Sequence, residues 1–451
     1  MKQKTNLTGT VIYPNDPDYW QARMNWNPFT NEFPIVFVFA HRTEDVSNAV
    51  KWARENNVPI RMRSGRHALA KDFSQTNGGI VIDTSKMTNV ILDKNHETAN
   101  VEAGIRVGAL VRMLAQEGFM APFGDSSTVG IGGISTGGGI TAIQRTTGLI
   151  SDNILHATMV DANGEILSVS EKKNPNLLWA IRGGGGGNFG IITSYGFKIY
   201  PAPSKVGIFK IVWPWKYLDE VINVWQKWSP SVDQRLGTIL EAYSKKNGLL
   251  RSQGIFLGPI SKLTKLIKPL IDVGPPINVF IDEVTLLEAI EFWAPNEPLF
   301  DTQNSTWSSA WVRRPLPKEG IKAIRSFLTE TTGSESNFFF LNSGGAMNQV
   351  HSKDTAFFWR HTKYYLEWDA SWIEESESEK SIELVEYTRK QLQPHIIGSY
   401  VNVPDLSLKN YGKEYYGDNL AQLQKIKKQY DPENVFNFVQ SIPPAHVSDH
   451  G

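Results

Sequence analysis

The chain of 451 residues contains no cysteine, which excludes disulfides, thiolate metal sites, iron–sulfur clusters and cysteine nucleophiles. It also lacks an apolar run of about 18 residues, the length of a membrane-spanning helix, and residues 1–6 lack the apolar core of a secretory signal. The 46 Lys and Arg balance the 46 Asp and Glu, so no net field attracts nucleic acid or an anionic membrane. We therefore expect a cytoplasmic protein that binds neither.

Metal-ligand spacing is missing as well. His351 and His361 lie close in sequence, but no set of His, Asp and Glu has a spacing such as His-Glu-x-x-His. We therefore predict no metal site. The hydrophobic fraction of 41% is typical of a globular protein, and the length is too great for one ordinary core.

Residues 34–200 alternate short β-branched runs with amphipathic helices. The pattern predicts strands at residues 35–39, 60–63, 79–82 and 191–200, helices over 44–56 and 107–117, and a hairpin joining 157–161 to 165–169. Gly118 is placed to close the second helix.

The composition changes after Pro201-Ala202-Pro203. Residues 205–395 are richer in Trp, Phe and charged helix formers, with predicted strands at 206–212 and 337–341 and helices at 217–228 and 319–329 that would cover one side of a sheet. Glycine and aromatic residues return from about residue 396, followed by a helix over 418–430. We predict a two-lobed α+β fold: residues 1–204 form the first lobe, 205–395 an inserted second lobe, and 396–451 return to the first.

Glycines concentrate in two blocks, which lie within residues 124–139 and 183–190. Main chain without Cβ atoms can close on a phosphate or a planar ring; the alternative is tight turns between strands. The second block contains Gly185-x-Gly187-x-x-Gly190, but a β pattern follows it, whereas a dinucleotide fingerprint opens a helix. We therefore reject a Rossmann site.

A third segment, Arg63-Ser64-Gly65-Arg66-His67, directly follows a predicted strand. Its amides and two arginines suit an anionic group. Taken alone, His67 could equally have a structural, hydrogen-bonded role.

Together these segments resemble one family: the berberine-bridge-enzyme-like flavin oxidases of the vanillyl-alcohol-oxidase superfamily, whose FAD domain is of the p-cresol-methylhydroxylase type. The resemblance covers most of the chain and is strongest in residues 34–203 and 396–444. Its motifs, in family order, are Arg63-Ser64-Gly65-Arg66-His67, Val101-Glu102-Ala103-Gly104, Thr128-Val129-Gly130-Ile131-Gly132-Gly133 with Gly137-Gly138-Gly139, Ser151-Asp152-Asn153, Leu178-Trp179-Ala180-Ile181-Arg182, Tyr415-Tyr416-Gly417-Asp418-Asn419 and Tyr430-Asp431-Pro432-Glu433-Asn434-Val435-Phe436.

The resemblance implies FAD, joined through its 8α carbon to His67 by a covalent bond. A neutral imidazole is a good nucleophile, and an electron-withdrawing link would make the flavin a stronger oxidant. The cofactor-binding residues that it implies are Arg63, Ser64, Gly65, Arg66, His67, Gly104, Val129, Gly130, Gly132, Gly133, Thr136, Gly137, Gly138, Gly139, Asn153, Gly190, Ile191, Ile192, Asn402 and Asn419.

Three positions depart from the family pattern. Ser126 stands where many relatives have a cysteine that forms a second flavin link, so we predict a single attachment. Ile134 replaces a common histidine. Val403 replaces the second tyrosine of Tyr-x-Asn-Tyr, which takes part in proton abstraction in some relatives.

Oxidation of a carbinol or amine carbon by hydride transfer needs a base for the O–H or N–H proton. Residues 363–368 read as a strand ahead of Trp372, and alternation puts Lys363, Tyr365 and Glu367 on one face. In relatives a polar or acidic catalytic residue lies on such a strand. Glu367 is therefore our first candidate base, with Tyr365 and Tyr400 as assisting phenols; the alternative is a solvated strand carboxylate.

The resemblance implies an oxidase that takes a hydride from a small alcohol or sugar onto flavin, with molecular oxygen as acceptor. Oxidative cyclisation or desaturation in secondary metabolism uses the same flavin residues and stays open. Two non-catalytic alternatives also stay open: a flavin-holding protein, and a carbohydrate-binding protein that uses some of the 14 tryptophans on its surface.

Overall fold

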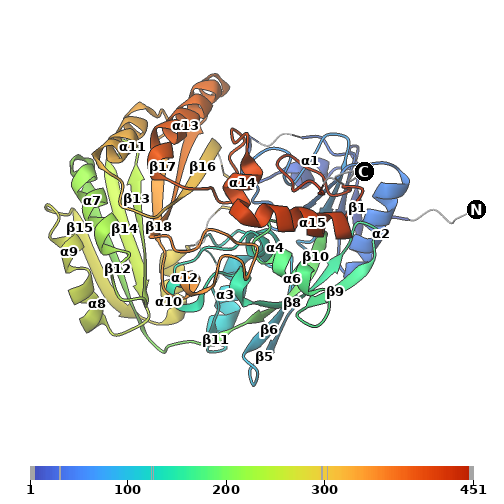
Figure 1. Ribbon diagram of the computed structural model, residues 1–451, viewed down its shortest axis with the longest axis horizontal. Coiled ribbons are helices and arrows are strands. Elements are labelled where there is room, and N and C mark those ends of the chain that lie inside the picture. Colours follow the sequence, from blue (N-terminus) through green and yellow to red (C-terminus); the bar gives the residue numbers. More distant parts are fainter. Residues whose placement is uncertain are drawn as a thin grey trace, which may run out of the picture.

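The computed structural model describes residues 6–29, 32–122, 124, 126–295, 298–301 and 303–445. It has two lobes, with the C-terminal segment lying against the N-terminal one (Figure 1). We call these the first lobe, which holds the strands up to residue 201 and the C-terminal segment, and the second lobe, which holds the strands from residue 206 to residue 372.

One sheet of the first lobe has the order β1 (Thr10–Ile12), β2 (Val36–Phe39), β4 (Ile80–Asp83), β3 (Ile60–Arg63). Strands β2, β4 and β3 are parallel; β2 and β4 are buried along their whole length, whereas β3 carries Arg61 and Arg63. Helix α2 (Thr43–Glu55) places Val46, Ala49, Val50 and Ala53 in the same core. Strand β3 ends directly at the Ser64–His67 loop, so this sheet fixes the position of that loop.

The other sheet of the first lobe is antiparallel, in the order β5 (Val90–Asp93), β6 (Thr98–Glu102), β10 (Ile191–Lys198), β8 (Ile154–Val160), β9 (Ile166–Ser170). Its core is shared with α3 (Val107–Gln116), α6 (Pro175–Ile181) and α15 (Leu420–Tyr430). Strand β10 follows the second glycine block directly, which confirms the rejection of a Rossmann turn.

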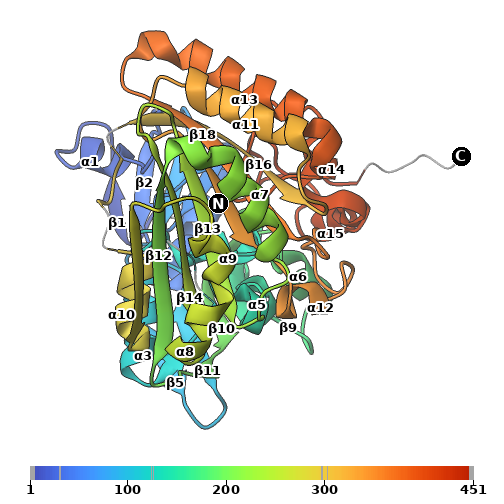
Figure 2. The same ribbon diagram turned by 90° about the vertical axis from the view of Figure 1, so that its left-hand side faces the viewer.

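The second lobe is built on seven antiparallel strands in the order β15 (Asn278–Val284), β12 (Val206–Pro214), β14 (Leu249–Phe256), β13 (Leu236–Tyr243), β17 (Asn337–Asn342), β18 (Tyr364–Trp372), β16 (Asn304–Val312). Helices cover one face, among them α7 (Leu218–Trp228), α11 (Lys318–Glu330) and α13 (Ser378–Leu392) (Figure 2). The opposite face packs on the first lobe through Trp311, Tyr365 and Tyr400.

The remaining helices are short connectors. They are α1 (Tyr19–Arg23), α4 (Ile131–Thr136), α5 (Gln144–Thr147), α8 (Ile260–Leu266), α9 (Lys268–Ile271), α10 (Leu286–Trp293), α12 (Ala346–Gln349) and α14 (Tyr411–Tyr416). The two-residue strands β7 (Phe119–Met120) and β11 (Tyr200–Pro201) pair with each other. Among the described residues, no helix is long and apolar enough to cross a membrane.

Buried charged groups join the lobes. Arg145, on α5, donates to the carbonyl oxygens of Ser229 (3.2 Å), Pro230 (3.3 Å), Val232 (2.8 Å) and Leu236 (3.0 Å). Its side chain therefore replaces water as the partner of four carbonyls on the second lobe.

The predicted two-lobed α+β fold, with an inserted antiparallel sheet covered by helices, is confirmed, while the exact boundaries at residues 204 and 395 stay a prediction. Two element ends need correction. The helix predicted over 418–430 begins at Leu420, because residues Gly417–Asn419 form a 3-10 turn. The strand predicted over 191–200 breaks after Lys198, and Tyr200 pairs elsewhere.

Candidate functional site

A cavity of about 620 Å³ lies between the lobes. The first lobe contributes the end of β3 and the loop that follows it, the first glycine block with α4, the second glycine block, and residues 400–404. The second lobe contributes Pro298, Phe300, Asp301, Trp307, Phe339 and Glu367. Segments far apart in the sequence thus meet at one place.

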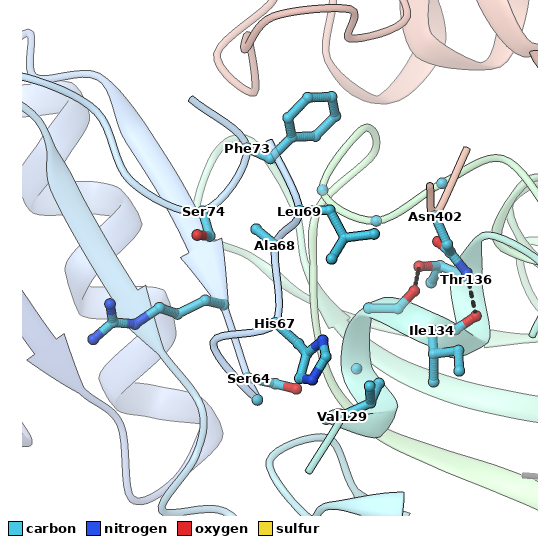
Figure 3. A pocket seen from close by; sticks show the side chains of 18 of the residues that line it. Ser64, His67, Ala68, Leu69, Phe73, Ser74, Val129, Ile134, Thr136 and Asn402 are labelled. Atoms are coloured by element: carbon cyan, nitrogen blue, oxygen red, sulfur yellow. Dashed lines mark hydrogen bonds between the residues drawn. The ribbon is translucent and has the colours of Figure 1, made fainter. Parts of the chain in front are cut away.

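Most of the cofactor-binding residues implied by the resemblance line this cavity. Figure 3 shows His67, Ser64 and Val129 close together, with Thr136, Ile134 and Asn402 grouped across from them. The lining residues of that set are Arg63, Ser64, Gly65, Arg66, His67, Val129, Gly130, Gly132, Gly133, Thr136, Gly190, Ile191, Ile192 and Asn402.

The loop after β3 and the first glycine block touch through their main chains. A Cβ atom on Gly65 would lie 2.1 Å from the nitrogen of Gly130, and one on Gly130 would lie 2.2 Å from the nitrogen of Gly65. Both contacts are impossible for a side chain, so this pair of loops requires glycine at both positions. At Gly133, by contrast, a Cβ would meet no described atom within 4 Å, and this residue lines the cavity.

Three glycines among the implied cofactor-binding residues, Gly137, Gly138 and Gly139, do not line the cavity. Gly137 leaves no room for a Cβ beside the Asn402 side chain. Gly138 adopts φ +128° against Phe357, and the N–H of Gly139 donates to the phenol oxygen of Tyr400 at 2.8 Å. These glycines let the loop pack tightly against residues 400–402.

Gly104, Asn153 and Asn419 also lie outside the lining. A Cβ on Gly104 would overlap the carbonyl oxygen of Thr84. Asn153 donates to the carbonyls of Thr147 and Leu149. Asn419 donates to three carbonyls, among them that of Ser352 at 2.7 Å. The hydrogen bonds of the two asparagines hold loops together within the protein, so their direct contact with a cofactor stays a prediction.

His67 is placed for chemistry at the cavity wall. Its ring stacks on Trp26 with centroids 4.6 Å apart, and Nε2 lies 3.2 Å from the hydroxyl oxygen of Thr128. Removal from water lowers the pKa of His67 most, a hydrogen bond with its own main chain opposes this shift, and the positive charge of Arg106 adds to it; the resulting pKa is about 3. The imidazole is therefore neutral and nucleophilic at ordinary pH.

Positive charge gathers next to this loop. Arg63 donates to Oδ2 of Asp83 at 2.6 Å, and Arg66 lies 3.5 Å from the same oxygen. Burial lowers the pKa of Arg63 to about 10, and Asp83 opposes this shift. Both arginines line the cavity and share one carboxylate, so the surplus charge favours an anionic group there.

These features fit a large cofactor that carries phosphates and a planar ring. The cavity is lined by several loops, glycines form part of its wall, and the charge at its β3 end is positive. FAD has these properties.

Two residues of β18, Tyr365 and Glu367, meet Tyr400 of the first lobe at the second-lobe wall of the cavity. Tyr365 and Glu367 both leave β18 on the side that faces the first lobe, but only Glu367 lines the cavity. Burial raises the pKa of Tyr365 well above its usual value, and the Glu367 carboxylate raises it further. Tyr365 thus stays a neutral donor. Tyr400 lines the cavity too, and its oxygen accepts from Asn402 Nδ2 at 2.8 Å.

Asp369 follows on the same side of β18 and was missed by the sequence analysis. It accepts a hydrogen bond from Asn337 Nδ2 at 3.0 Å. Burial raises the pKa of Asp369 well above its usual value, and the charges of Glu367, Asp301 and Glu335 raise it further, against a main-chain hydrogen bond at Asn337.

Trp26, Asp301 and Trp307 are further cavity residues that sequence reasoning missed. The ring centroids of Trp26 and Trp307 lie 6.2 Å apart, with an interplanar angle of 54°. Local sequence gives no signal for them, since each belongs to a segment whose partner is distant in the chain.

The segment Gly133-Ile134-Ser135-Thr136-Gly137 matches the spacing of a serine-hydrolase elbow. However, Ser135 is fully buried within α4, and its hydroxyl finds no hydrogen-bond partner among the described residues. Among the described residues, no base therefore activates Ser135 as a nucleophile. Within the part of the chain that the structure describes, no group of three or more His, Asp or Glu side chains could hold a metal ion.

Comparisons with known proteins agree with this site. Residues 34–170 match the family described as FAD binding domain, and residues 399–443 match the one described as Berberine and berberine like. The Bacillus subtilis (strain 168) protein "Uncharacterized FAD-linked oxidoreductase YvdP" is 53% identical over 98% of this chain and 99% of its own length. Arabidopsis thaliana "Berberine bridge enzyme-like 23" is 28% identical over 93% of this chain and 85% of its own.

The solved structure of Physcomitrella patens BBE-like 1 superposes with a TM-score of 0.91 at 29% identity, covering 98% of both chains. Sequence and fold relatives therefore extend over both lobes and over the cavity between them. The chain belongs to the berberine-bridge-like FAD-linked oxidases of the vanillyl-alcohol-oxidase superfamily.

Proposed function

We propose that this enzyme holds FAD through a single covalent bond to His67 and oxidises a small alcohol or sugar, with Glu367 as the base and molecular oxygen as the acceptor. The observation that carries the proposal is the placement of a neutral imidazole and a carboxylate on opposite lobes of one cavity. Bound flavin supplies the hydride acceptor.

The covalent bond is supported by the chemistry of His67. Its pKa of about 3 leaves a nitrogen lone pair available at any physiological pH. Ser126, which also lines the cavity, carries a hydroxyl that cannot form a thioether. Because position 126 is a serine, we expect one covalent link between protein and flavin rather than two.

Glu367 is supported as the base by its access to the cavity and by its partner. It accepts the Tyr365 hydroxyl at 2.5 Å, which holds the carboxylate in one orientation. A carboxylate held in this way can take the substrate hydroxyl proton as the hydride leaves.

The second-lobe wall supports an uncharged or cationic substrate. Of the described residues that this lobe gives to the cavity, two are carboxylic (Asp301 and Glu367), three are aromatic, and none is basic. An anionic substrate would meet like charge there, whereas a hydroxyl-rich ring could stack and donate hydrogen bonds. Oxidative cyclisation of an amine-containing substrate is the second candidate that this wall allows.

The two non-catalytic alternatives lose support. Family membership favours an enzyme. Trp213, Trp225, Trp311, Trp368 and Trp372 are less than 2% exposed, so these tryptophans serve the core and are not a carbohydrate platform.

Purified protein tests the proposal directly. We expect a yellow preparation whose flavin stays with the protein after acid precipitation. A screen of neutral alcohols, sugars, amines and sugar acids for peroxide release should give turnover with neutral or cationic compounds and bleach the flavin band when air is excluded. A colourless protein, or flavin lost on denaturation, would contradict the cofactor assignment.

A further inference from the structure

The imidazole ring of His67 contacts Trp26 through one face and Thr128 through one edge. Trp26 covers the face, with an interplanar angle of 19° and centroids 4.6 Å apart. Thr128 meets the edge at Nε2, 3.2 Å away. Trp26 comes from a different part of the chain from both of them, so its contact with His67 depends on how its own segment is anchored.

That anchoring is extensive. The N–H of Trp26 donates to the carbonyl of Arg66 at 2.8 Å, and its carbonyl accepts from the N–H of Asp301 at 2.9 Å. The next residue, Asn27, is fully buried and donates to the carbonyls of Leu69 (2.8 Å) and Ser305 (3.0 Å). Residues 26 and 27 are therefore tied to the His67 loop on one side and to the second lobe on the other.

The preceding helix α1 is tied down by the cavity loop as well. Arg66 donates to the carbonyl of Gln21 at 3.0 Å, and Arg63 donates to the carbonyl of Ala22 at 2.6 Å. Gln75 donates to the carbonyl of Arg23 at 2.7 Å. Five hydrogen bonds with residues 63–75 and two with residues 301 and 305 thus fix the segment that carries Trp26.

We propose that Trp26 is the positioning residue for covalent attachment of flavin at His67, an inference that rests on the proposed function. Attachment forms a bond between an imidazole nitrogen and the 8α carbon, and it breaks one C–H and one N–H bond. The two electrons and two protons pass to molecular oxygen, which gives hydrogen peroxide. The indole fixes the plane of the ring and keeps water from its face, so the nitrogen is already oriented when the cofactor binds.

A purely structural role for Trp26 predicts something else. As a filler beside Trp307 it would contribute to stability, and its loss would lower the melting temperature without changing the proportion of bound flavin that becomes covalent. The proportion that is covalently attached therefore separates the two roles.

The test compares Trp26→Leu and Trp26→Phe with Trp20→Leu as the matched control, because Trp20 lies six positions earlier and is 66% exposed. Each protein is purified after incubation with excess FAD. Total flavin per protein is measured by absorbance, covalent flavin by fluorescence of the denatured band, and stability by thermal melting.

We expect Trp26→Leu to bind flavin but to attach at least about fivefold less of it than the wild type, and Trp26→Phe and Trp20→Leu to attach nearly all. Attachment by Trp26→Leu as complete as in the wild type would overturn the inference. So would loss of all flavin from folded Trp26→Leu, since a positioning role acts after binding. If Trp26→Leu does not fold, Trp26→Met takes its place, with the same fivefold loss expected and full attachment counting against the inference. Flavin that is bound but not covalent in the wild type would instead reject the link in the proposed function.

Discussion

The phenol oxygen of Tyr365 lies 2.5 Å from Oε2 of Glu367, two positions further along β18. Both side chains project from the same side of the strand, and of the two residues only Glu367 lines the cavity. Under the proposed function the two residues have different roles: Glu367 faces the substrate, and Tyr365 orients Glu367.

Replacing Glu367 by Gln should slow flavin reduction by about a hundredfold, since an amide cannot take the substrate proton. Anaerobic stopped-flow absorbance with a substrate from the screen measures this rate. Glu374→Gln, in the exposed turn after the same strand, is the control and should leave the rate unchanged. Equal rates for Glu367→Gln and the wild type would remove Glu367 from the reaction.

Replacing His67 by Ala should leave a protein whose flavin is released by acid. Since the pKa of His67 lies near 3, the wild type should attach flavin to the same extent from pH 5 to pH 9. Acid precipitation followed by absorbance of the supernatant gives both results. His96→Ala, on an exposed turn, should retain the link. Covalent flavin in His67→Ala would show that another residue forms the bond.

Asp369 should limit stability at neutral pH. A carboxyl with a raised pKa stabilises the fold below its ordinary pKa, and this contribution disappears as the pH rises through the raised value. Asp369→Asn should therefore raise the melting temperature by about 2 °C or more at pH 7.5 and by less at pH 4.5. The exposed Asp272→Asn serves as the control. A gain in melting temperature that is larger at pH 4.5 than at pH 7.5 would contradict a raised pKa for Asp369.

Asp301 should repel anions from the cavity. Benzoate, titrated against the flavin absorbance band, should bind about tenfold more tightly to Asp301→Asn than to the wild type, and the difference should shrink in high salt. Asp282→Asn, on the far edge strand β15, should bind like the wild type. Unchanged benzoate affinity in Asp301→Asn would mean that this carboxylate does not face the ligand.

Local patterns were sufficient for the elements that build the cofactor half of the cavity. Strand β3 has the predicted bounds, and α3 ends one residue before the predicted end, because β-branched runs and a 3.6-residue apolar period are properties of neighbouring residues. The glycine blocks could also be located, since a main chain that must approach another loop needs glycine at particular positions. The motif order then indicated FAD.

The substrate half of the cavity could not be predicted in the same way. Asn27 bonds to Ser305, 278 positions away, and this pairing brings Trp26 to His67. The order of the second sheet places β18 between β17 and β16 and so sets the neighbours of Glu367. Such relations depend on tertiary packing, and alternation along β18 alone could not show that Glu367 reaches the cavity while Tyr365 does not.

The four carbonyls that surround the Arg145 guanidinium have a consequence for how ligands come and go. Separating the two lobes at this point would break four hydrogen bonds of a buried cation together, so these bonds oppose such a movement. We therefore expect ligands to enter and leave through movements of side chains, while the contact between Arg145 and the second lobe persists.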